Sequence, residues 1–480
     1  MDIKQDTTNL EQFRYTLYQN LNHRADTLMD LLDAMCSVPD ARSVVEYSLA
    51  ACFPRSYSTI FKAVDEMNLG EMWLPYQMGP YLPRPKRWPF WLLMVDVTPA
   101  PRQYAHTLED RGMVYQPEVV KGKLPVTIGH QYSTVALSLE PEAGVGNALG
   151  ASWVLPLLTK RVASAKDKEM VGAGQIEMLL KDDKLPFGQE LTVEVGDTSY
   201  SKPAYLHAHG KFPNLVTLAR VRGNRTFYHQ YVPTQEEMEN PDPGHPTWYG
   251  ERFSLSAPQT WSKPDETLTL WETSRRGKVY RVEIQAWHNL LMSGKNKPER
   301  LPMHEHPFTL VRIVRYDEEG NEAFKHPLWL ILMGQRRHQL TLEYIYQAYL
   351  CRFDIEHSGA PWARFGKQKL LLADFQTPEV EREENWWQLV HIAYAQLWMA
   401  RHVANALPRP WERNLPAMQQ RLISPTLVQR DFARIIRQLG TPAQPPKPRG
   451  ISPGRRKGMI LPKRPRQNVV VKSQNTAQAA

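Results

Sequence analysis

The order of strand-like and helix-like segments between residues 91 and 222 constrains the fold more than any other feature. Three runs rich in β-branched and aromatic residues are followed by helix, strand, helix and strand, at 91–98, 127–139, 150–158, 168–182, 190–201, 204–212 and 215–222. Strands grouped and then alternating with helices in this way indicate a mixed α/β sheet.

The segments on either side of this core differ in composition, and these differences set the predicted domain boundaries. A chain of 480 residues is long enough for two to four structural units. The predicted parts are an N-terminal helical domain at 1–75, a proline-rich linker at 76–90, the first part of the α/β core at 91–222, an all-β insertion at 223–335, the second part of the core with C-terminal helices at 336–440, and a tail at 441–480.

The tail is basic and rich in proline and glycine. No acid follows Asp431, whereas nine bases occur from Lys447 onward, among them Arg455, Arg456 and Lys457. The whole chain carries a net charge of +9, so these bases account for nearly all of it. Such a composition predicts a disordered arm that engages phosphates by counterion release, with a merely solvated tail as the alternative.

Several protein classes are disfavoured by composition. No run approaches the roughly 20 apolar residues of a membrane helix, and the polar N-terminus predicts no signal peptide. Three widely spaced cysteines fit neither a disulfide framework nor a zinc cluster, so a reducing cytoplasm is the expected location. The glycines of 144–150 lack the spacing of a phosphate loop, so no nucleotide cofactor is expected. His207 and His209 are interpreted as surface or turn residues rather than zinc ligands.

Two strands of the core end in an aspartate, and a late helix carries a third candidate acid. Asp96 follows the first apolar run, and Asp197 follows the run at 190–196. Each acid alone suits a turn at the end of a strand. Together with Glu356 they could form a carboxylate cluster, which divalent cations such as Mg²⁺ would neutralise. Two such ions would promote in-line displacement at a phosphate.

The helix around Glu356 presents two further polar side chains on the same face. Tyr349, Arg352 and Glu356 are separated by three and four residues, a spacing that aligns them along one side of a helix. An exposed Arg–Glu pair is the simpler interpretation of this spacing alone. Three bases follow closely, namely Arg364, Lys367 and Lys369.

The strand order, the β insertion and the segment "YLCRFDIE" resemble the DDE transposases of bacterial insertion sequences. The closer similarity is to the branch that has a ribonuclease-H-like core and a Tyr-x-x-Arg-x-x-x-Glu helix, and Tyr349, Arg352 and Glu356 match that spacing. The segments "VDVTPAPR" and "VGDTSYS" resemble the family's first and second aspartate regions. One position departs from the pattern, because Ala363 stands where the family often has a lysine.

The resemblance implies a function and roles for individual residues. Asp96, Asp197 and Glu356 would be catalytic and would hold two Mg²⁺ ions, for which Mn²⁺ could substitute. Tyr349 and Arg352 would contact phosphates of double-stranded DNA, and Arg364, Lys367 and Lys369 would add positive charge. The N-terminal helices would read the terminal inverted repeats, and a homodimer would hold two transposon ends. The expected activity is excision and strand transfer of an insertion element.

Two alternatives stay open at this point. The chain could be a DNA-binding regulator that kept the fold and lost catalysis, although all three acids persist. It could also be another ribonuclease-H-like nuclease, such as a junction resolvase.

Overall fold

The computed structural model divides the chain into two compact units, each of which is considered by itself. It describes residues 3–116, 120–122, 124–140, 153–235, 238, 247–274, 277–294, 300–352, 362–406, 423–448, 454, 456–460 and 462–471. The helical unit comprises Met1–Arg84, Val97–Lys168 and Phe353–Thr476, and the sheet unit comprises Pro85–Asp96, Glu169–Arg352 and Ala477–Ala480.

The helical unit combines the two ends of the chain. Its helices are α1 (Ile3–Asn20), α2 (Ala25–Ser37), α3 (Ser58–Glu66), α4 (Trp73–Met78), α10 (Trp362–Lys369), α11 (Val380–Ala406) and α12 (Pro425–Leu439). Helix α11 packs against α1, α2, α3 and α12. The N-terminal helices therefore share one unit with the C-terminal helices, whereas the sequence predicted a separate domain at 1–75.

Buried side chains and capping residues explain why these helices form and pack. Trp386 and Trp387 of α11 are fully buried, and the buried Arg14 of α1 donates to Asp33 of α2 at 2.9 Å. Helix α12 begins at a Ser424 cap that accepts a hydrogen bond from the backbone of Leu427, and it ends before Gly440 at a positive φ of 75°.

The helical unit also holds three antiparallel strands and part of the tail. Strand β3 (Val126–Ser138) pairs with β2 (Gly112–Tyr115) and with β4 (Val154–Val162). In the tail, the backbone of Gln467 donates to His106 at 2.8 Å and that of Val470 to Arg111 at 2.7 Å. Residues 462–471 were predicted to be disordered, yet in the structure they hydrogen-bond beside β2.

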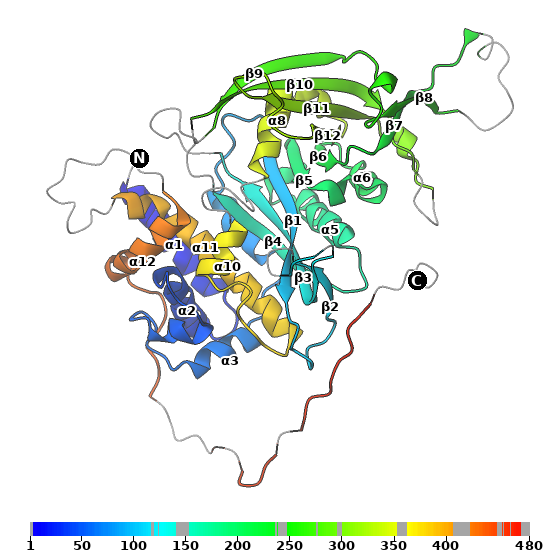
Figure 1. Cartoon of the computed structure of the whole chain (residues 1–480). Coiled ribbons are helices and arrows are strands. Elements are labelled where there is room, and N and C mark those ends of the chain that lie inside the picture. The colour runs from blue at the N-terminus through cyan, green and yellow to red at the C-terminus, as the bar shows by residue number, and fades with distance from the viewer. Residues whose placement is uncertain are drawn as a thin grey trace. The chain divides into compact units, whose positions relative to one another are not determined.

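The sheet unit is built on one mixed sheet, visible in Figure 1 with helix α8 (Leu342–Cys351). Its strand order is β1–β5–β6–β12–β11–β10–β9. The strands are β1 (Trp91–Pro101, of which the sheet unit holds the first part), β5 (Thr192–Gly196), β6 (Leu215–Val221), β9 (Glu266–Thr273), β10 (Val279–Leu290), β11 (Phe308–Tyr316) and β12 (Leu328–Met333). Strands β1, β5 and β6 are parallel, and the others are antiparallel to their neighbours.

The strands predicted as an insertion extend this sheet. Strand β12 pairs directly with β6, so β9–β12 belong to the same sheet as the parallel strands. A separate hairpin is formed by β7 (Thr226–Gln230) and β8 (Tyr249–Ser254). The predicted fold class, a mixed α/β sheet flanked by helices, is confirmed.

The sheet has a buried core on each face because apolar residues alternate along its strands. Helix α8 covers one face, where Leu342, Ile345 and Tyr349 pack with residues of β5, β6, β10, β11 and β12. The opposite face packs with Leu206 of α6 (Pro203–His209) and with the β7–β8 hairpin. Helix α5 (Lys168–Lys181) precedes β5. Within the described residues, no helix has the length and apolar composition needed to cross a bilayer.

Candidate active site

Asp96 lies within β1, just past the part of that strand that pairs with β5, and Asp197 directly follows the neighbouring parallel strand β5, whereas the sequence predicted that both strands end in an aspartate. The pairing of β1 with β5 sets Trp91 opposite Thr192 and Met94 opposite Val195. The same register, continued by two residues, sets Asp96 opposite Asp197. Since adjacent strands are separated by about 4.8 Å, the two carboxylates begin from neighbouring backbone positions.

The alternation of side chains is expected to place both aspartates on the face of the sheet that α8 covers. Side chains alternate along a strand, so Asp96 shares a face with Leu92, and Asp197 shares one with Val195. Leu92 and Val195 belong to the buried cluster that also contains Tyr349 of α8. Both aspartates are half-buried. The sheet and α8 thus bring the two acids and the predicted Tyr–Arg helix to one face of the sheet unit.

Asp197 is held in place by the turn that it begins. Its carboxylate accepts a hydrogen bond from the backbone of Ser199 at 2.7 Å, and its carbonyl accepts one from Tyr200 at 3.1 Å. This caps the short helix Thr198–Ser201. The preceding Gly196 lets Tyr200 approach closely, because a Cβ at position 196 would lie 2.7 Å from the Tyr200 Cβ.

The pKa of the Tyr200 hydroxyl responds to the negative charges at this edge of the sheet. Burial raises the pKa of its hydroxyl well above the ordinary value, and the negative charges of Asp96, Asp197, Glu169 and Glu194 raise it further. The hydroxyl is buried and has no hydrogen-bond partner among the described residues. The charges of both Asp96 and Asp197 therefore act on this one buried hydroxyl.

A buried polar network lies on the face of β5 opposite to the one that α8 covers. Glu194 is fully buried and accepts hydrogen bonds from the hydroxyls of Tyr205 and of Thr217, the latter at 3.3 Å. Its carboxylate is also 2.9 Å from Nδ1 of His209. The network ties α6 and β6 to β5, the strand that directly precedes Asp197. His209, predicted as a surface or turn residue, is buried, so that interpretation was wrong.

Arg220 is a candidate residue that the sequence interpretation missed. The pairing of β5 with β6 sets Gly196 opposite Ala219, so the next residues, Asp197 and Arg220, are also level. Arg220 shares a face with the buried Leu218 and is itself exposed. A cationic side chain therefore lies one strand away from the acid pair, on the same face.

The predicted Tyr–Arg–Glu helix is described only in part. Tyr349 is fully buried in α8, and Arg352 is half-buried at its carboxyl end. Glu356 lies outside the described residues, so its distance from the two aspartates is not given by the structure.

The remaining predicted DNA contacts belong to the helical unit. Arg364 is exposed on α10, where Ala363 is largely buried, and Lys367 is half-buried. The ammonium group of Lys369 donates to the carbonyl of Pro39 at 3.0 Å, so it has a structural contact. In the tail, Arg456 and Lys457 are exposed, and Arg455 lies outside the described residues.

The donor atoms at the acid pair suit a hard divalent cation. Carboxylate oxygens are the ligands that Mg²⁺ prefers, and Asp96 and Asp197 begin from adjacent positions on the same face. A cation there would offset two negative charges next to a buried hydroxyl. Among the described residues, which do not include Glu356, no three metal-ligating side chains gather in one place.

Comparison with known families identifies the same part of the chain. A family model described as DDE superfamily endonuclease matches residues 16–292, more than half of the chain. The match includes Asp96, Asp197 and Arg220 and ends before α8. The curated proteins include no match to this chain.

Proposed function

Because the chain belongs to the DDE superfamily endonucleases, which act on DNA, we propose that it is a transposase. It would excise an insertion element at its terminal inverted repeats and join the element to a new DNA site. The observation that supports the proposal is the parallel register of β1 with β5, which pairs Met94 with Val195 and, continued by two residues, would bring Asp96 level with Asp197.

Three acids would hold the metal ions that such a reaction needs. Asp96 and Asp197 supply two carboxylates, and Glu356, four residues beyond Arg352, would supply the third. Two bound Mg²⁺ or Mn²⁺ ions would activate the attacking oxygen and stabilise the leaving oxygen of an in-line displacement. The carboxylates fix where those ions can sit, and the buried network around Glu194 supports the strand that carries Asp197.

Cationic and polar side chains would hold the DNA strand against this edge. Arg352 is able to bind one phosphate through both arms of its guanidinium, and exposed Arg220 is able to bind another. Water would first cleave the phosphodiester at the transposon end and free a 3′-hydroxyl. That hydroxyl would then attack a target phosphate, so that one phosphodiester forms as another breaks. A homodimer would hold both ends together.

A cleavage and strand-transfer assay tests this function. The purified protein is incubated with Mg²⁺ and duplexes that carry the inverted repeats bracketing its gene. Excised ends and joined products are expected. End binding without cleavage would instead identify a regulator, and cleavage of branched DNA without joining would identify a resolvase-like nuclease.

Arg220→Gln is expected to reduce DNA cleavage roughly tenfold or more, because one charge-assisted phosphate contact is lost. Arg220→Lys should retain part of the activity, since it keeps the charge but not the guanidinium fork. The matched control is Arg252→Gln, at an exposed arginine on β8. Equal activity of Arg220→Gln and the control would remove Arg220 from the DNA path.

The exposed tail bases are expected to set part of the salt dependence of DNA binding. Replacing Arg456 and Lys457 together with Gln should lower the slope of log affinity against log salt by up to about 1.8, since each phosphate contact contributes about 0.9. Arg464→Gln is the control, because Arg464 already pairs with Glu379. DNA affinity is measured between 50 and 200 mM salt, roughly the range over which phosphate contacts weaken. An unchanged slope would show that Arg456 and Lys457 do not contact phosphates, which favours a merely solvated tail.

A further inference from the structure

The sheet unit contains a cavity of about 420 Å³ that the proposed reaction does not use. It is bordered by β9–β12, by the turn Arg337–Gln339 and by the start of α8. Neither Asp96 nor Asp197 lines it. Its size falls within the range of roughly 300–1,000 Å³ that is typical of small-molecule sites.

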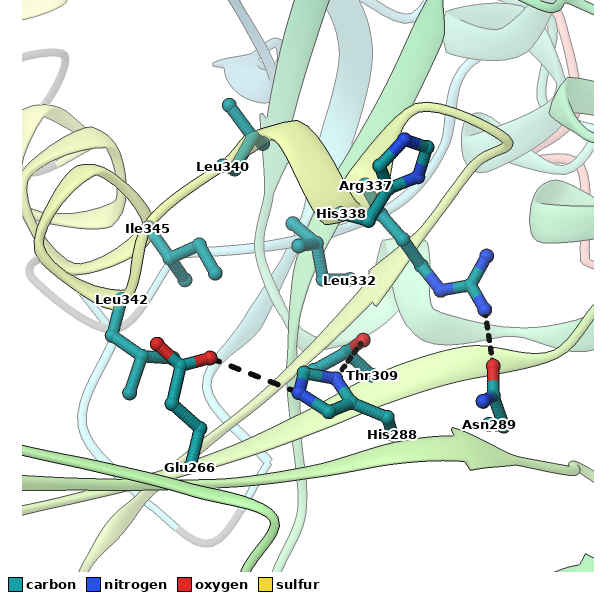
Figure 2. A pocket seen from close by; sticks show the side chains of 10 residues that line it. All are labelled: Glu266, His288, Asn289, Thr309, Leu332, Arg337, His338, Leu340, Leu342 and Ile345. Atoms are coloured by element: carbon teal, nitrogen blue, oxygen red, sulfur yellow. Dashed lines mark hydrogen bonds and ion pairs between the residues drawn. The ribbon is translucent and has the colours of Figure 1, made fainter.

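One wall of the cavity is formed by an arginine that has no acidic partner among the described residues. Arg337 donates to Oδ1 of Asn289 at 2.6 Å, as Figure 2 shows, and to the carbonyl of Gly334 at 3.1 Å. Both acceptors are neutral. Burial alone lowers the pKa of Arg337, and no acid of the described residues counteracts it. A half-buried guanidinium that lacks a countercharge gains stability when an anion pairs with it.

The two residues that accept hydrogen bonds from Arg337 both have unusual backbone conformations. Asn289 has a positive φ of 57°, which is uncommon for a residue other than glycine, and it lies at an irregularity of β10 between Trp287 and Leu290. Gly334 has a φ of 145°, and a Cβ there would lie 2.4 Å from the carbonyl oxygen of Leu215. Two unusual conformations thus position the two acceptors of one guanidinium.

The rest of the cavity combines an apolar surface with polar groups. Leu332, Leu340, Leu342 and Ile345 form the apolar part, and all four are buried. In Figure 2 the ring of His288 lies between Glu266 and Thr309, with its Nδ1 3.1 Å from the threonine hydroxyl. Exposed His338 also lines the cavity.

We propose that this cavity binds a small organic anion, whose carboxylate or phosphate pairs with Arg337 while an apolar body lies on the leucine and isoleucine side chains. His288 and Thr309 would bind a polar edge of that body. The guanidinium of Arg337 would favour ligands with an anionic group, and the apolar surface would favour organic anions over inorganic ones. Binding of an anion in this cavity does not depend on DNA cleavage and is expected whether or not the protein is a transposase.

Isothermal titration calorimetry on the full chain without DNA tests this site. Two organic anions, thymidine 5′-monophosphate and phenylacetate, represent the phosphate and carboxylate sources. At least one of them is expected to bind one molecule per chain. Inorganic phosphate, and uncharged benzyl alcohol, should bind at least roughly tenfold more weakly, because each lacks one of the two required features.

Substitutions locate the binding. Arg337→Gln should weaken binding roughly 10- to 100-fold, and Arg337→Lys should weaken it less. Arg336→Gln is the matched control, because Arg336 binds Gln339 and Asn214 and does not line the cavity. His338→Trp, at an exposed lining position, should block entry without changing the core. Absence of binding by both organic anions, or equal affinity of wild type and Arg337→Gln, would overturn the proposal.

Discussion

Asp96→Asn and Asp197→Asn are each expected to reduce DNA cleavage by roughly 10³-fold or more, while binding of transposon ends stays nearly unchanged. The amide keeps the size of the side chain but removes the charge that a divalent ion requires. A bound metal contributes several kcal/mol of transition-state stabilisation, and each 1.36 kcal/mol corresponds to about a tenfold change in rate.

The choice of asparagine separates loss of chemistry from loss of folding. Asp197 caps a turn through the backbone of Ser199, and asparagine caps such turns about as well as aspartate. Cleavage rates and end affinities are measured side by side with Asp183→Asn, an exposed aspartate of the same unit. Near-normal cleavage by either active-site variant would exclude that residue from metal binding and would leave the proposed mechanism without support.

Gly196→Ala is expected to reduce cleavage roughly 10²-fold with little change in DNA affinity. The added methyl group would lie 2.7–2.9 Å from three atoms of Tyr200, closer than non-bonded carbons approach. Tyr200 must then shift, and it belongs to the turn that fixes Asp197. A displacement of about 1 Å in a catalytic arrangement is able to cost about two orders of magnitude in rate.

A second glycine provides the control for this substitution. Gly174 lies in α5, and a Cβ there would meet nothing within 4 Å. Gly174→Ala should therefore leave cleavage unchanged and stabilise the helix by roughly 0.5–1 kcal/mol. Thermal unfolding is recorded for both variants. If Gly196→Ala cleaves as fast as Gly174→Ala, the position of Asp197 does not depend on the packing of Tyr200.

The sequence predicted local features of this protein well. The apolar runs before Asp96 and Asp197 form β1 and β5, and the C-terminal helices lie within the predicted range 336–440. These features depend on residues that are close together in the chain. Alternation and capping are readable from a short window, so no knowledge of distant partners is needed.

Features that depend on distant partners were not predicted. Arg220 was overlooked because only the pairing of β5 with β6 sets it level with Asp197. The strands at 266–333 were recognised individually, but the pairing of β12 with β6, which makes them part of the core sheet, has no local signal. His209 of α6 was placed at the surface because no local signal shows that it is buried against Glu194 of β5.

The network around Glu194 also restricts how this family can diversify. Tyr205, His209 and Thr217 all direct polar atoms at one fully buried carboxylate. Removal of any one of these side chains leaves a buried polar atom of another without a hydrogen-bond partner. Each such buried atom costs about 1–3 kcal/mol or more of folding stability. Related sequences should therefore keep all four of Glu194, Tyr205, His209 and Thr217, or replace all four with aliphatic residues. Sequences that keep only some of the four should be rare.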